Sequence, residues 1–144
     1  MRLIDYFERG LRYYPERTCV IDAGGEYSYR EVGERSHRTA NALISGGLKV
    51  EDTVAILSPN GAPAFEAWIG AARAGGVWVG LAALASIDEN IYVINNRESA
   101  WLFYHSSFED EIARIKAECP KLKHVICLDK PGMSHPYFID FIAD

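Results

Sequence analysis

The sequence is poor in cysteine and has no stretch dense in lysine or arginine. Its three cysteines include no C-x-x-C pair, which excludes the common zinc-ribbon and thioredoxin-type motifs. An odd number of cysteines suits a reducing compartment, where cysteine serves as a small core residue. The chain carries 15 basic and 20 acidic residues, a formal net charge of −5. This balance argues against nucleic acid or an anionic membrane as the main partner.

No secretory signal and no membrane span are expected. Asp5 and Glu8 interrupt the apolar run that a signal peptide would need near the N-terminus. The apolar stretch 62–86 contains Glu66 and Arg73, and each such charge costs about 2.5–3.5 kcal/mol at the centre of a membrane helix. We therefore interpret this stretch as a buried helix followed by a buried strand, and we expect a cytoplasmic protein.

Signature motifs of the common nucleotide-binding and hydrolytic sites are also missing. The sequence has no G-x-x-x-x-G-K-[ST] phosphate loop, no G-x-G-x-x-G, no G-x-S-x-G and no H-E-x-x-H. Paired glycines at 46–47 and 75–76 each follow a predicted helix, whereas a phosphate cradle precedes one, so they predict helix ends. Cys119 and His124 lack the second ligand pair of a structural zinc site. We predict no catalytic residue and no metal site in this chain.

Alternating helical and strand patterns fill the chain. Two β-rich runs, 18–22 and 26–29, are joined through Gly24-Gly25 and predict a hairpin. After it, helices and strands alternate, which implies right-handed βαβ units and a mostly parallel sheet covered by helices on both faces. We therefore predict an α/β fold with three αβα layers and a small N-terminal hairpin. The other predicted strands are 53–57, 77–81, 101–104 and 124–128.

Helix starts and helix faces can also be predicted from local patterns. On the helix that follows the hairpin, Ile44 belongs to the stripe expected to face the core. Asp110 stands four residues before Arg114 and predicts an ion pair on a helix surface. Three S-x-x-E patterns predict capping boxes: Ser28 with Glu31, Ser86 with Glu89, and Ser106 with Glu109.

The last part of the sequence, residues 137–142, begins a strongly apolar helical pattern. A domain rarely ends on a bare apolar turn. We therefore expect residues 1–144 to form a single α/β subdomain within the N-terminal part of a longer chain.

Polar residues follow the predicted strands at the edge where open parallel sheets bind ligands. Ordinary loop and cap roles explain the same residues, so both interpretations stay open. The candidates are Ser58 and Asn60 after one strand, His105 and Ser106 after the next, and Asp129 and Lys130 after the last.

Several longer phrases carry a resemblance to a known family. They are turn and packing phrases: YPERT at 14–18, YSYREV at 27–32, LKVEDTVAI at 48–56, PN at 59–60 and AGGVWV at 74–79. In this order the chain resembles the N-terminal part of the adenylate-forming (AMP-binding) superfamily, specifically the acyl-CoA synthetases (fatty-acid–CoA ligases). It departs from the family at Gly80, where a proline is usual, and at Ala82-Ala83, where asparagine-proline is usual.

The resemblance implies a two-step ligase. A carboxylate, expected to be that of a fatty acid, attacks the α-phosphate of Mg-ATP to give an acyl-adenylate and pyrophosphate, and the thiol of CoA then displaces AMP. The family's motifs for ATP, Mg and CoA lie beyond the matching segment, so no catalytic or cofactor-binding residue carries over to this chain. We expect the segment alone to be inactive, with the remainder of a parent chain as its partner.

Two other interpretations stay open. The chain could be a stand-alone doubly wound module that binds a nucleotide or a partner protein, which a polar, well-capped final helix would favour. It could also be an interaction subunit that completes its core as a homo-oligomer. That interpretation predicts an exposed apolar patch on the order of several hundred Å².

Overall fold

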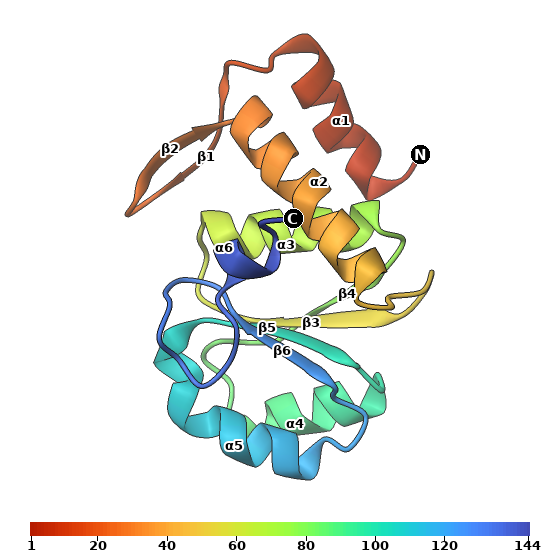
Figure 1. The fold of residues 1–144 in the computed structure, drawn as a ribbon, viewed down its shortest axis with the longest axis vertical. Helices are drawn as coiled ribbons and strands as arrows, with labels where there is room; N and C mark the ends of the chain where they lie inside the picture. The colour runs from red at the N-terminus through yellow and green to blue at the C-terminus, as the bar shows by residue number, and fades with distance from the viewer.

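Short apolar runs separated by helical segments assemble into a parallel sheet between two layers of helices. A computed structural model describes residues 1–144 (Figure 1). The strands are β1 (Thr18–Asp22), β2 (Gly25–Ser28), β3 (Thr53–Leu57), β4 (Val77–Gly80), β5 (Trp101–Tyr104) and β6 (His124–Cys127). The helices are α1 (Leu3–Tyr13), α2 (Tyr29–Ser45), α3 (Ala62–Arg73), α4 (Ile87–Asn96), α5 (Glu109–Glu118) and α6 (Phe138–Phe141), with a 3-10 turn η1 (Ser106–Phe108) before α5. The predicted α/β fold is confirmed, and β2 lies one residue earlier than expected because Tyr29 already begins α2.

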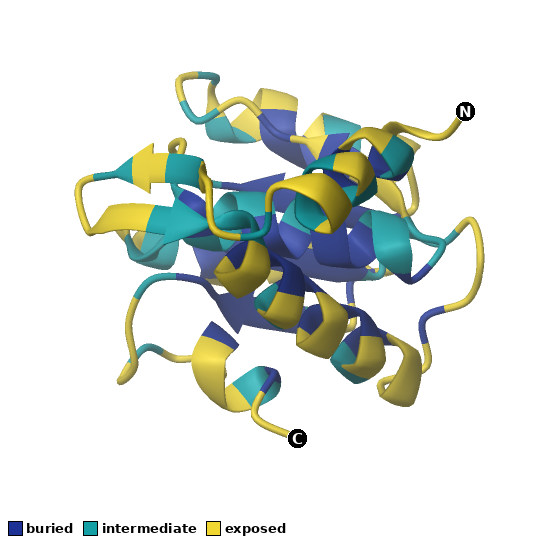
Figure 2. Ribbon diagram, turned by 90° about the horizontal axis from the view of Figure 1, so that it is seen from above, coloured by how far each residue is buried: buried dark blue, intermediate teal, exposed yellow.

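The sheet is parallel, with the strand order β4-β3-β5-β6, while β1 and β2 form a separate antiparallel hairpin. Successive side chains along a strand point to opposite faces. In β3, Val54 and Ile56 therefore enter one apolar core, and Ala55 and Leu57 enter the other. Both faces of the sheet are buried at β3, β5 and β6 (Figure 2), which explains why these strands are near-continuous apolar runs. The edge strand β4 is mostly exposed, so the prediction of a buried strand there is wrong.

The helices cover the two faces of the sheet in different ways. α2, α3 and α6 pack on one face, and α4 and α5 pack on the other (Figure 1). α1 lies outside α2 and α3, where Ile4 and Phe7 join Val32 and Ile69 in a third apolar cluster beside the hairpin. The first helix, α1, thus forms an extra layer outside the helices that cover the sheet.

Two of the three predicted capping boxes are confirmed. The hydroxyls of Ser28 and Ser86 each accept a hydrogen bond from the backbone N–H three residues on. The third prediction is wrong, because the amide and the hydroxyl of Ser106 both donate to the carboxylate of Asp129, each at 2.7 Å. α5 consequently begins only at Glu109, after the 3-10 turn.

Both glycine pairs end helices, as predicted. Gly47 has a φ of +98°, and the N–H of Leu48 donates to the carbonyl of Leu43 at 2.9 Å. Gly75, with a φ of +84°, ends α3 in the same way. These are left-handed C-caps, which a side chain would strain.

Two predictions about helix surfaces are wrong. Ile44 is 54% exposed, because α2 turns the face that carries Leu43 toward the core. Arg114 forms ion pairs with Asp88 and Glu118 rather than with Asp110. Since α4 and α5 lie side by side on the same face, a carboxylate of the neighbouring helix is within reach of this arginine.

The apolar residues that follow β6 are packed rather than bare. Phe138 and Ile142 are buried in the core under α2 and α3. The ring of Phe138 meets that of Phe103 edge to face, with centroids 5.9 Å apart. This final short helix completes the cover of β5 and β6 on that face.

Cysteine burial agrees with a role in packing. Cys119 and Cys127 are buried, Cys19 is half-buried, and none of the three forms a disulfide. Burial raises the pKa of all three thiols, which keeps them protonated and unreactive at neutral pH. None of the helices combines the length and the apolar character that crossing a membrane requires.

The packing of Gly70 in α3 against α2 leads to the first prediction. A Cβ added at Gly70 would lie 2.4 Å from Cβ and Cγ2 of Thr39. We expect Gly70→Ala to lower the free energy of unfolding by about 1–3 kcal/mol, because the two helices must move apart. Gly61→Ala is the control, since its Cβ would meet nothing closer than 3.6 Å. Equal stability of the two variants in urea unfolding would contradict the tight packing.

Candidate functional site

The order of the strands opens the carboxyl edge of the sheet between β3 and β5. The chain leaves β3 through α3, which covers one face, and leaves β5 through α5, which covers the other. In open parallel sheets, a crevice forms where neighbouring connections diverge in this way. The hairpin of β1 and β2 stands over this edge and forms the outer wall of a cleft.

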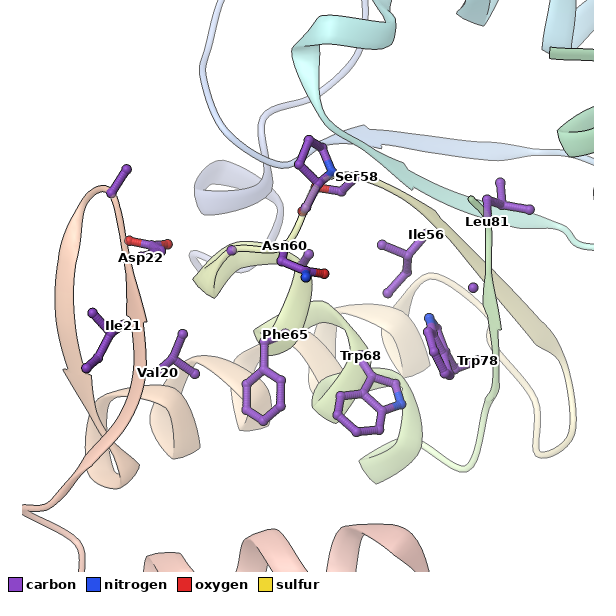
Figure 3. A pocket seen from close by; sticks show the side chains of 15 residues that line it. Val20, Ile21, Asp22, Ile56, Ser58, Asn60, Phe65, Trp68, Trp78 and Leu81 are labelled. Carbon is purple, nitrogen blue, oxygen red and sulfur yellow. The ribbon is translucent and has the colours of Figure 1, made fainter. Parts of the chain in front are cut away.

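The cleft has two lobes that share the loop 58–61 after β3. The first, which we call the aromatic lobe, is a cavity of about 520 Å³ between the hairpin, α3 and β4 (Figure 3). The second, the polar lobe, is a cavity of about 380 Å³ that extends toward β5 and β6. Ser58 and Asn60 line both lobes, and His105 and Asp129 line the polar lobe.

The aromatic lobe is walled by an aromatic chain that runs from α3 to the edge strand. The ring centroids of Phe65 and Trp68 are 5.3 Å apart, and those of Trp68 and Trp78 are 5.4 Å apart. Ile21 on the hairpin and Trp78 on β4 are 70% and 48% exposed. The lobe therefore offers a largely apolar surface, with polar side chains at the loop 58–61 and Asp22 and the indole nitrogens of Trp68 and Trp78 in its wall (Figure 3).

Four of the six strand-end candidates are brought together, but they are bound to one another or to their own loop. Asp129 accepts two hydrogen bonds from Ser106 and lies 3.3 Å from Nε2 of His105. Burial raises the pKa of Asp129, but the hydrogen bonds from Ser106 and the interaction with His105 together lower it by more than this. The net effect is a pKa below the ordinary value of an aspartate. The hydroxyl of Ser58 donates to the carbonyl of Pro59 at 2.8 Å.

The remaining two candidates differ in their surroundings. The side chain of Asn60 forms no hydrogen bond with the protein and borders both lobes. Lys130 is exposed and borders neither lobe. The loops after β5 and β6 are thus joined by side-chain hydrogen bonds, and Asn60 is the strand-end candidate with free bonding capacity toward the cleft.

Sequence reasoning missed Asp22, the residue that attaches the hairpin to the sheet. The N-cap residue of α3 is Gly61, which has no side chain to accept a hydrogen bond from the first turn. Instead, one oxygen of Asp22 accepts the N–H of Ala62 at 2.8 Å, and the other accepts the N–H of Gly24 at 2.7 Å. A glycine at the capping position was the available signal, but it does not say which distant residue supplies the acceptor.

A second missed residue is Glu66, which is fully buried between α2 and α3. Its Oε1 is 3.2 Å from Nη1 of Arg35, while its Oε2 is buried without a partner. Burial raises the pKa of Glu66 to about 7, and the nearby Asp22 and Glu31 add to the rise, while Arg35 opposes it in part. This carboxyl is therefore partly protonated at neutral pH.

The polar lobe does not fit a triphosphate or its metal ion. It is lined by two carboxylates, Asp22 and Asp129, and by no lysine or arginine. No group of three or more His, Cys, Asp or Glu side chains is placed to hold a metal ion. Anionic phosphates would meet negative charge here, without the cations that such groups require.

The fold and the carboxyl-edge cleft define a three-layer α/β domain of the doubly wound type. Within this class the chain belongs to the AMP-binding enzyme family, which matches residues 7–141. Membership agrees with the resemblance of the turn and packing phrases and favours the ligase-family interpretation over a stand-alone module.

Named relatives and solved structures support the same family. The medium/long-chain-fatty-acid–CoA/3-oxocholest-4-en-26-oate–CoA ligase of Mycolicibacterium smegmatis is 24% identical over 129 residues, which are 90% of this chain and 23% of that relative. The crystal structure of the anthranilate CoA ligase AuaEII in complex with anthranoyl-AMP shares the fold with a TM-score of 0.90 at 24% identity, over 97% of this chain and 26% of that one. ATP-bound MatB from Rhodopseudomonas palustris has a TM-score of 0.76 at 28% identity, over 97% of this chain and 28% of that one. The chain thus spans about a quarter of the length of the relatives that it matches.

The contact between the hairpin and α3 leads to the second prediction. We expect Asp22→Ala to lower the free energy of unfolding by about 1 kcal/mol, because it removes the only side-chain acceptor for the first turn of α3. Amide hydrogen exchange should accelerate at Ala62 and along the hairpin. Asp22→Asn is the matched control, since its amide oxygen can still accept the N–H of Ala62. Unchanged exchange at Ala62 in the alanine variant would contradict the capping role.

The third prediction concerns the pH dependence of stability. The pKa of Glu66 is about 7 in the folded protein, above its ordinary value of 4.5, so the folded state holds this proton more tightly than the unfolded state. The associated stability is therefore complete below about pH 4.5 and is lost as the pH rises through 7, by an amount on the order of 3 kcal/mol. Glu66→Gln should flatten this part of the profile in urea unfolding, whereas exposed Glu34→Gln should not. A parallel profile for wild type and Glu66→Gln would exclude this assignment.

Proposed function

We propose that this chain forms the N-terminal α/β part of an ATP-dependent acyl-CoA ligase. In the first step of that reaction, an oxygen of a carboxylate attacks the α-phosphorus of ATP, and pyrophosphate leaves. In the second, the sulfur of CoA attacks the acyl carbon, its proton is lost, and AMP leaves. The observation that carries the proposal is the match of the AMP-binding enzyme family over residues 7–141, supported by relatives that are CoA ligases.

In this proposal the chain contributes a scaffold rather than reacting groups. Both reactants of the first step are anions, so their approach must be assisted by cations or backbone donors. The cleft provides Asp22 and Asp129 instead, and the side chains of Ser58 and His105 are engaged in their own loops. The hydroxyl of Ser106 donates to Asp129. The residues that bind ATP, Mg²⁺ and CoA would therefore come from outside this chain, which would be their partner as a folded support.

Asn60 is the strand-end residue that we assign to a ligand or to a neighbouring segment of such an enzyme. Its amide offers both a donor and an acceptor at the junction of the two lobes, and no protein group uses either. The apolar wall beside it suits an uncharged, partly apolar group.

A fatty acid is the substrate class that we propose, and the cytoplasm the proposed location. Support for the substrate comes from the name of the Mycolicibacterium smegmatis relative, at 24% identity. Support for the location comes from the unpaired cysteines and the lack of a spanning helix. A carboxylic acid of another kind would leave the proposed reaction class unchanged.

The fourth prediction tests the proposed function. The full reading frame that contains these residues should convert a fatty acid, ATP and CoA into acyl-CoA, AMP and pyrophosphate. The 144-residue chain alone should release no acid-dependent pyrophosphate above background. Thin-layer analysis of AMP formation and mass spectrometry of the thioester measure both. Adenylate formation by the 144-residue chain, or none by the full frame with a panel of fatty and aromatic acids, would refute the proposal.

A further inference from the structure

A second cavity lies at the opposite edge of the sheet from β4, along the outer side of β6. It has a volume of about 230 Å³ and is formed by the end of α5, the start of β6, and the segment that carries His135 and Pro136. It shares no residue with either lobe of the carboxyl-edge cleft. The cavity is therefore a separate feature from the carboxyl-edge cleft.

Every ionisable group that lines this cavity is basic. These groups are Lys116, Lys123, His124 and His135, and no acidic residue accompanies them. The chain as a whole has a net charge of −5, so the cluster is a local reversal of its charge. The ion pairs of the structure use arginines and His105, and neither lysine of the cavity takes part in one.

The basic groups are close enough to disfavour one another. Nζ of Lys116 lies 3.2 Å from Nε2 of His135. Burial lowers the pKa of His135, Lys116 lowers it further, and Glu109 opposes these effects in part. Burial also lowers the pKa of His124, and Lys123 adds to that decrease. Glu109 offsets only part of the repulsion at His135, and an anion between the basic groups would offset more of it.

An aromatic contact holds one of the basic groups in place. The ring of His124 stacks on that of Trp101 with centroids 3.8 Å apart and planes at 13°. Phe141 packs against the same indole at 6.1 Å. The imidazole is thus fixed by packing, so that a ligand would not have to order it on binding.

The backbone of β6 adds a donor on the same side. The N–H groups of His124 and Leu128 point toward β5. They donate to the backbone carbonyls of Ala100 and Tyr104. Cys127 points the other way and donates to the carbonyl of Pro136 at 2.8 Å. Val125 lies two residues before Cys127, so its N–H also points outward, where it borders the cavity.

The shape of this edge favours a small anion over a peptide strand. The segment that ends in Pro136 already pairs with β6 at Cys127, so an added strand would find one open position and then a covered edge. A cavity of about 230 Å³ accommodates a phosphate group or a small phosphate ester. Lysine suits such a ligand because its ammonium group is a compact charge that can approach a phosphate from several directions, unlike the planar guanidinium of arginine.

We propose that the cavity beside β6 is a binding site for a phosphate dianion, held by Lys116, Lys123, the two histidines and the N–H of Val125. The same chemistry is presented by a free phosphate monoester and by the headgroup of phosphatidic acid. The volume of the cavity does not distinguish between these two sources, so the experiment must.

The test is a titration of the 144-residue chain with inorganic phosphate at constant ionic strength, followed by amide and indole NMR signals. We expect saturable shifts at Val125 and Trp101, and a loss of affinity of about tenfold or more in Lys116→Ala/Lys123→Ala. The matched control is Lys121→Ala/Lys130→Ala, which removes the same charge from exposed positions outside the cavity. Co-sedimentation with phosphatidylcholine vesicles, with and without phosphatidic acid, determines whether a headgroup also enters.

Each outcome has a defined meaning. Saturable binding that the first double variant loses and the control keeps supports the site, and the arm that responds identifies the source. Shifts that never saturate, or an equal loss in both double variants, would show only non-specific attraction and overturn the proposal. His135→Gln guards against a folding artefact, because it removes one basic group without changing either lysine and should weaken binding to a smaller extent.

Discussion

The burial of one sheet on both faces determines the arrangement of the other elements. β3 is flanked by β4 and β5 and covered by helices above and below, so its backbone groups must be paired within the sheet and its side chains must be apolar. Parallel neighbours cannot be joined by a tight turn. Each connection crosses a face as a helix, so α3, α4 and α5 are at once the links between strands and the cover that keeps them dry.

The same constraint places the cleft and limits what it can contain. Because α3 and α5 leave toward opposite faces, the loops after β3 and β5 separate at the carboxyl edge. The gap is closed from outside by the hairpin, which Asp22 attaches to the first turn of α3. Ser106, His105 and Asp129 bind one another across the loops. The side chains that the topology gathers here hold the walls together, and few of them are left to hold a ligand.

Local signals predicted the elements well, and long-range competition caused the errors. Ser28 caps its helix as its pattern indicated, but Ser106, in the same pattern, is taken by Asp129. The cap of α3 comes from Asp22, 40 positions away in the sequence, and no pattern of neighbouring residues encodes such a distance. Glu66 stands in a helix where a carboxylate usually indicates solvent, and its burial became visible only when α2 was placed against α3.

The carboxyl-edge cleft and the cavity beside β6 carry charges of opposite sign. The cleft contains carboxylates and no lysine or arginine, and the positive groups without ion pairs include the two lysines beside β6. A reaction that brings a carboxylate to a triphosphate is opposed by repulsion between the reactants, which acidic walls would increase. For a ligase to use this edge, its other segments must supply enough positive charge to outweigh Asp22 and Asp129. A domain that only supports such segments needs a rigid edge, which these two carboxylates provide through their hydrogen bonds.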